Sequence, residues 1–125
     1  MTGFFRRRAS NYHKMVEERI ESEMPNISIK KEPPMLNQSS YIFRPDFVLK
    51  RDEKTFIIEA KDQVKPKDVA LFEGKIMGLD AHPIILSYVN PDVNTTQLAD
   101  ELNIKLISGP PSEAVRKLKE VINES

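Results

Sequence analysis

The chain has 125 residues, of which 39% are hydrophobic and 30% are charged, and nineteen basic residues balance nineteen acidic ones. This length and apolar share predict one folded domain over residues 1–125 and exclude a disordered or fibrous chain. There is no cysteine, which excludes disulfides, thiolate metal sites and cysteine nucleophiles, and no apolar run approaches the ~20 residues of a membrane span. We therefore expect a cytoplasmic protein without a membrane partner.

The charge is distributed unevenly along the chain. Residues 1–75 carry a net charge of +3 and residues 76–125 a net charge of −3, so a polyanion is expected to bind the first half. Arg7 lies in a run of three arginines that follows two phenylalanines. Residues 1–9 therefore have the composition of a flexible basic arm for nucleic acid, with ordinary fraying of the terminus as the alternative.

In the first half of the chain, the spacing of apolar residues predicts an amphipathic helix that ends at Pro25, and two later segments rich in aromatic and β-branched residues indicate a hairpin. The expected elements are a helix over 10–24, a short strand around 27–29, a loop over 31–40, and a hairpin of residues 41–50 and 55–61.

In the second half, Pro66 is suited to the first turn of a helix, and Ser112 is suited to cap the last helix. The expected elements are a helix over 66–78, a buried strand over 83–89, a helix over 95–103, a strand over 104–107, and a final helix from 112. The order α-β-β-β-α-β-α-β-α predicts an α/β fold with a mixed sheet covered by helices on both faces.

The hairpin contains the residues of chemical interest. If its turn is centred between residues 52 and 53, three successive facing pairs are apolar, which supports this register. These pairs are Leu49 with Phe56, Val48 with Ile57, and Phe47 with Ile58. The same register places Asp46 opposite Glu59, and Arg44 opposite Lys61. Two carboxylates ~5 Å apart repel each other unless one is protonated or a cation lies between them.

A hard divalent cation would resolve this repulsion. Mg²⁺ takes one or two protein carboxylates and completes its coordination with water and phosphate oxygens. Held by Asp46 and Glu59, it could activate water and neutralise charge on a phosphate. The alternative is a solvated ion cluster across two strands, in which Asp46 reaches diagonally to Lys61 and no metal is needed.

The motif Pro45-Asp46, followed after twelve residues by Glu59-Ala60-Lys61, resembles the PD-(D/E)xK motif of restriction-endonuclease-like nucleases. The α-β-β-β-α-β order expected over residues 10–89 resembles the core of that superfamily. The small size is most similar to archaeal Holliday-junction resolvases and small Mrr-like nucleases. The Gln-x-x-x-Tyr sequence of the RecB-like branch is absent after the motif.

The resemblance implies a role for each motif residue. Asp46 and Glu59 would bind Mg²⁺ or Mn²⁺, and Lys61 would assist the attacking water. Glu17, on the border of the apolar stripe of the first helix, would complete the metal ligands, with pairing to a nearby base as the alternative for this residue. His13 is interpreted as a half-exposed structural residue.

The basic residues near the motif suit contacts with phosphate. They are Arg44, Lys65, Lys67 and Lys75, together with Arg7 of the terminal arm. The sequence therefore predicts a Mg²⁺-dependent nucleic-acid phosphodiesterase, an endonuclease or exonuclease, with DNA as the expected substrate. The alternative is a nuclease-like module without catalysis that binds nucleic acid or a protein. A homodimer is also expected, because a chain of this length offers little surface to grip a duplex.

Overall fold

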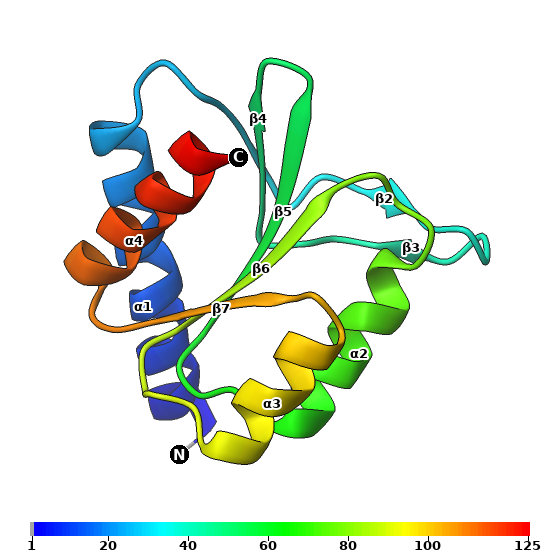
Figure 1. The fold of residues 1–125 in the computed structure, drawn as a ribbon. Helices are drawn as coiled ribbons and strands as arrows, with labels where there is room; N and C mark the ends of the chain where they lie inside the picture. Colours follow the sequence, from blue (N-terminus) through cyan, green and yellow to red (C-terminus); the bar gives the residue numbers. More distant parts are fainter. Residues whose placement is uncertain (1) are drawn as a thin grey trace.

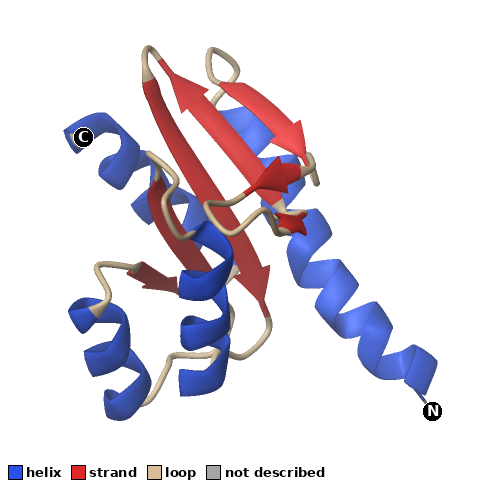
Figure 2. Ribbon diagram, turned by 90° about the vertical axis from the view of Figure 1, so that its right-hand side faces the viewer, coloured by secondary structure: helices blue, strands red, loops and turns tan. Residues whose placement is uncertain are grey.

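A five-stranded sheet forms the centre of the protein, with helices on both of its faces (Figures 1 and 2). The computed structural model describes the backbone of residues 2–125 and the side chains of residues 11–125. The helices are α1 (Thr2–Glu23), α2 (Pro66–Ile76), α3 (Val93–Glu101) and α4 (Pro111–Glu124). The strands are β1 (Ser28–Lys31), β2 (Met35–Leu36), β3 (Ile42–Phe43), β4 (Phe47–Arg51), β5 (Lys54–Lys61), β6 (His82–Ser87) and β7 (Lys105–Ser108).

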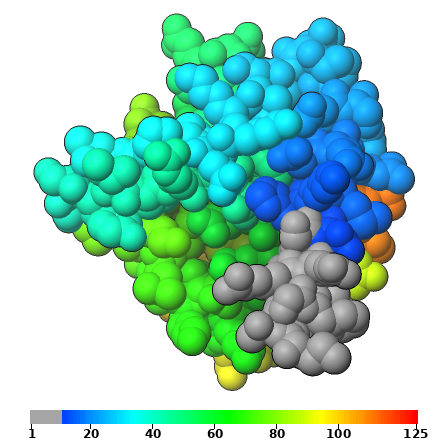
Figure 3. Space-filling view, turned by 180° about the vertical axis from the view of Figure 1, so that it is seen from behind, coloured from blue at the N-terminus to red at the C-terminus, as the bar shows by residue number. Residues whose placement is uncertain are grey.

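The sheet is mixed, in the strand order β1-β4-β5-β6-β7. Strands β1, β4 and β5 are antiparallel neighbours, whereas β5, β6 and β7 run parallel and are joined by α2 and α3. The predicted α/β class is thus confirmed. The predicted loop over residues 31–40 contains β2, which pairs with β3 in a separate two-stranded ribbon. The predicted hairpin strand over 41–50 is interrupted, since its first part forms β3 and its second part forms β4. From behind, the cyan segment that contains β1 and β2 lies beside blue α1 and above green α2 (Figure 3).

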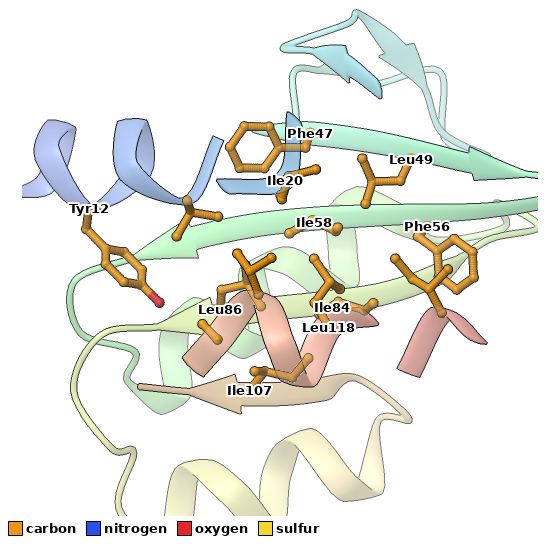
Figure 4. Packing of buried hydrophobic residues seen from close by; sticks show 14 residues of the cluster. Tyr12, Ile20, Phe47, Leu49, Phe56, Ile58, Ile84, Leu86, Ile107 and Leu118 are labelled. Atoms are coloured by element: carbon orange, nitrogen blue, oxygen red, sulfur yellow. The ribbon is translucent and has the colours of Figure 1, made fainter. Parts of the chain in front are cut away.

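Each face of the sheet is covered by its own hydrophobic core. On one face, α1 and α4 pack against alternate residues of β4, β5 and β6, as Figure 4 shows for Ile20, Phe47, Ile58, Leu86 and Leu118. On the other face, α2 and α3 pack on the intervening residues, which include Val48, Ile57 and Ile85. Successive side chains of a strand point to opposite faces of the sheet. Alternate residues of β5 therefore pack against α1 and α4, and the residues between them pack against α2 and α3.

Several element boundaries differ from the sequence prediction. Helix α1 begins at Thr2 rather than at residue 10. Helix α3 begins two residues earlier than expected because Asp92 caps it, its Oδ1 accepting a hydrogen bond from the Thr95 amide at 2.8 Å. The prediction that Ser112 caps α4 is wrong, since the helix starts at Pro111, whose ring is preorganised for the first helical position.

The register of the hairpin is confirmed over the length of β4, where Phe47 faces Ile58 and Leu49 faces Phe56. A tight contact fixes the chain after α2, where Gly78 has a φ of 79° and an added Cβ would lie 2.5 Å from the Gln38 side chain. Within residues 2–125, no helix has the length and apolarity needed to cross a membrane.

Candidate functional site

The candidate site lies where β4 begins and β5 ends. Asp46 occupies a bend just before β4, and its backbone carbonyl accepts a hydrogen bond from the Glu32 amide at 3.0 Å. Its carboxylate reaches across to β5, where Oδ2 accepts a hydrogen bond from the Ala60 amide at 2.8 Å. The Asp46 side chain therefore replaces a strand carbonyl as the partner of β5.

The expected ladder does not continue past Phe47. Pro45 has no N–H to donate, so the chain before Asp46 leaves the sheet. The predicted pairing of Arg44 with Lys61 is consequently wrong: the ladder of β4 and β5 ends at Phe47 and Ile58, and the Arg44 guanidinium donates to the Glu32 carbonyl at 3.1 Å.

Glu59 is the most buried acid of the motif, with 9% of its surface exposed. Glu59 is two residues after Ile57 on β5, so its side chain points to the same face of the sheet, which α2 covers. Burial raises the pKa of Glu59, and the charge of Asp46 raises it further. Burial also raises the pKa of Asp46, against the opposing effect of the Ala60 hydrogen bond. The two carboxylates are thus partly dehydrated and close enough to repel each other.

Two lysines offset this negative charge. Lys61, the last residue of β5, is half-buried, and its charge lowers the pKa of both Asp46 and Glu59. Lys75 of α2 holds its Nζ 4.0 Å from Glu59 Oε1, with 37% of its side chain exposed. Neither cation outweighs burial, since the pKa of each acid stays above its ordinary value. Two acids and two lysines therefore meet at this strand end, and burial keeps both carboxylates easier to protonate than they are in water.

His13 of α1, interpreted from the sequence as a half-exposed structural residue, is half-buried and lies at the same strand end. Its ring contacts Phe47 at a centroid distance of 4.9 Å, and its charge lowers the pKa of Asp46. Nε2 is buried and has no hydrogen-bond partner among the residues that the structure describes. The only sequence signal was its position one turn before Glu17, which does not reveal a contact with β4.

Glu17 is half-buried on α1, and its carboxylate lies 3.5 Å from the ammonium group of Lys31 on β1. Lys31 is also 2.7 Å from Glu21. Among the side chains of residues 11–125, no three His, Asp or Glu residues form a group that could hold a metal ion. Glu17 therefore pairs with a lysine in this structure and does not join Asp46 and Glu59.

The other predicted phosphate contacts are at the edge of this region or beyond it. Lys65 precedes α2 and is exposed, and its amide donates to Asp68 at 2.9 Å. Lys67 is exposed on the first turn of α2. Arg7 and the predicted basic arm lie outside the residues whose side chains are described. Among the predicted contacts whose side chains are described, only Lys75 forms an ion pair with a motif residue.

The donor set at the strand end fits a hard divalent cation. Mg²⁺ and Mn²⁺ favour oxygen ligands, and Mg²⁺ commonly takes only one or two carboxylates from a protein. Asp46 and Glu59 supply two such carboxylates on adjacent chain segments, and both are partly dehydrated. Two carboxylates are enough for such an ion, so the pairing of Glu17 elsewhere does not remove the fit.

No protein-family model and no curated protein sequence matches the chain. Solved structures do. They include Can2 from Sulfobacillus thermosulfidooxidans in complex with cyclic tetra-adenylate, with a TM-score of 0.69 and 19% identity. The protein of unknown function AF1548 matches with a TM-score of 0.63 and 19% identity, and VC1899 from Vibrio cholerae with 0.56 and 22%.

Each of these matches covers 90% of this chain. The chain spans 66% of the AF1548 chain, 36% of the Can2 chain and 31% of the VC1899 chain. At these identities the likeness establishes a shared fold.

Proposed function

We propose that this protein is a divalent-metal-dependent phosphodiesterase of the PD-(D/E)xK superfamily that acts on nucleic acid, with DNA as the expected substrate. The observation that carries the proposal is the pair of partly dehydrated carboxylates at one strand end, Asp46 and Glu59, with Lys61 near both. A buried pair of acids destabilises a fold unless a ligand uses it, so a purely structural role is disfavoured.

In this proposal, Asp46 and Glu59 hold Mg²⁺ or Mn²⁺, which when bound would lower the pKa of a water molecule and offset charge on the phosphate. The Ala60 amide fixes the Asp46 carboxylate, so that its free oxygen needs no rearrangement to bind. Lys61 orients the water or stabilises the charge that develops on the phosphate. When no metal ion is bound, Lys75 pairs with Glu59. When the ion is bound, Lys75 is free to contact a phosphate of the substrate.

Two observations support nucleic acid as the substrate class. Lys65, Lys67 and Lys75 lie on or just before α2, the helix that covers Glu59, and they outnumber the two acids of that helix, so this segment suits contact with the phosphates of a polyanion. The fold is shared with Can2, which was solved with a cyclic oligonucleotide. Its ligand contains phosphodiester bonds, the bond type that the proposed chemistry requires.

The test is cleavage of a DNA panel with Mg²⁺ or Mn²⁺: plasmid, single strand, flap and four-way junction. Lys61→Ala should lose about a hundredfold or more in cleavage rate and keep its affinity for DNA measured in Ca²⁺. The matched control is Lys54→Ala, at the opposite end of the same strand, which should cut like the wild type. Equal rates for the Lys61→Ala and Lys54→Ala variants would exclude Lys61 from the reaction.

A second candidate is a module that binds nucleic acid without cutting it. It is favoured by the absence, among the described side chains, of a group of three His, Asp or Glu residues that could hold a metal ion. Binding of the panel in Ca²⁺, with no cleavage in either Mg²⁺ or Mn²⁺, would establish this function in place of the first.

A further inference from the structure

One tyrosine next to the candidate site presents its ring to solvent. Tyr88 follows β6 directly and is 49% exposed, whereas each phenylalanine with a described side chain is buried. Tyr41, near the β2–β3 ribbon, is the other exposed tyrosine, with 53% exposure. Val89 and Val93, in the segment after Tyr88, are also exposed, so the ring lies on an apolar rim.

The Tyr88 ring is held in place from beneath. Tyr12 of α1 contacts it edge-on, with ring centroids 5.4 Å apart and planes at 89°. Tyr12 is itself only 3% exposed, and its hydroxyl donates to the Gly109 carbonyl at 3.1 Å. A buried and hydrogen-bonded support reduces the conformational freedom that Tyr88 would lose on binding a ligand. Tyr41 has no aromatic contact within the described residues.

Tyr88 is fastened to the strand that carries the motif. Its amide donates to the Lys61 carbonyl at 3.0 Å, and the next amide, of Val89, donates to the Asp62 carbonyl at 3.0 Å. The preceding residue, Ser87, is the parallel partner of Lys61. The backbone of Tyr88 therefore lies beside the end of β5, with its ring on the side of α1, whereas Glu59 faces α2 across the same strand end.

We propose that Tyr88 is a stacking platform for one unpaired base of the substrate, next to the phosphodiester bond that is cut. This inference rests on the proposed function, because it names the substrate class of that same site. A base inside a duplex has both faces covered by its neighbours, so an exposed ring selects a single strand, a frayed end or a junction. The lysines contact phosphates, and Tyr88 reads the presence of a base.

The chain has no tryptophan, so Tyr88→Trp introduces a single fluorescent reporter. In Ca²⁺, a single-stranded oligonucleotide should quench this fluorescence, whereas a blunt duplex and an oligomer of abasic sugar-phosphate should not. The matched control is Tyr41→Trp, a tyrosine of similar exposure on the β2–β3 side, which should respond to none of the three. An unquenched reporter at position 88 under conditions where the strand binds would overturn the proposal.

Affinity gives a second measurement. Tyr88→Ala should bind the single strand about 5- to 150-fold more weakly, and Tyr88→Phe, which keeps the ring, should bind within about twofold of the wild type. The abasic oligomer should bind all three proteins equally. If Tyr88→Ala binds the single strand as tightly as Tyr41→Ala does, the stacking role is wrong.

The two proposals fail separately. A wild type that cuts DNA, with a Tyr88→Ala variant that cuts single strands equally well, would remove the platform and leave the nuclease. A wild type that never cuts, with a tryptophan at position 88 that is still quenched by single strands, would remove the nuclease and leave the platform. Should Tyr88→Ala fail to fold in circular dichroism, the tryptophan and phenylalanine variants still decide between these outcomes.

Discussion

Two clusters on this protein contain the same types of side chain, acids and lysines, but one cluster is exposed and the other is partly buried. The exposed cluster joins α1 to β1 and consists of Glu17, Glu21 and Lys31. The strand-end cluster lies where β4 begins and β5 ends and consists of Asp46, Glu59, Lys61 and Lys75. Comparing them separates an ion cluster that water solvates from one whose carboxylates are partly dehydrated, so that a bound cation would stabilise them more.

In the exposed cluster one lysine lies between two acids, at 2.7 and 3.5 Å, and the three side chains are 24–47% exposed. Water solvates whatever charge the lysine does not balance, and such pairs contribute only ~0–1 kcal/mol to stability. In the strand-end cluster the Glu59 side chain is 12% exposed and its lysine is 4.0 Å away. Because burial removes water from these two carboxylates, the pKa of both acids is raised despite the nearby lysines.

The largest expected difference between the clusters is in cleavage. Glu59→Gln should reduce the rate at least about a hundredfold, because it removes a proposed metal ligand at the reacting centre. Glu21→Gln makes the same chemical change in the exposed cluster and should cut at the wild-type rate. The measurement is cleavage of the DNA panel in Mg²⁺. Equal loss in the two variants would mean that the difference in burial has no catalytic meaning.

The strand-end cluster was partly predictable because its parts are local. Alternation of apolar residues in the hairpin fixed the register, and the register brought Asp46, Glu59 and Lys61 to one end. The departure of the chain at Pro45 was also in the sequence, since proline cannot donate to a ladder. The new position of Arg44 was not predicted, because its hydrogen bond to the Glu32 carbonyl depends on the path of the loop between β1 and β4.

The contacts that could not be predicted join elements distant in sequence. Whether Glu17 meets a metal site or Lys31 depends on how α1 lies across β1, and no local pattern sets that packing. The same holds for His13 against Phe47 and for Tyr12 beneath Tyr88, whose partners are more than thirty residues apart. Sequence reasoning therefore found the motif and Lys75 beside it, and missed the contacts that α1 makes with the sheet.

The second difference is in stabilisation by metal. A cation bound at ten times its Kd should add about 1.4 kcal/mol to the free energy of unfolding, or roughly 3–6 °C in Tm for a domain of this size. Millimolar Mg²⁺ or Mn²⁺ should raise the Tm of the wild type and of Glu21→Gln. Asp46→Asn should abolish the rise. A rise of the same size in Asp46→Asn would place the cation at some other group.

The smallest expected difference is in how stability depends on pH without metal. Burial raises the pKa of Asp46 and Glu59 above their ordinary values of 3.8 and 4.5, so the folded protein binds these protons more tightly than the unfolded chain does. Their contribution to stability is therefore greatest below those ordinary values and falls as the pH rises through the higher folded-state values. The Glu59→Gln variant has no proton to lose at this position, so it avoids the loss of stability that Glu59 causes as the pH rises.

We expect the free energy of unfolding of Glu59→Gln, relative to wild type in EDTA, to increase from about pH 4 upwards and to level off once Glu59 is ionised in the folded protein. Urea titrations at a series of pH values measure this difference directly. Glu21→Gln loses a solvated pair and should show no such gain. A Glu59→Gln variant whose relative stability stays flat, or falls as the pH rises, would mean that Lys61 and Lys75 already balance the carboxylate and leave no charge for a cation.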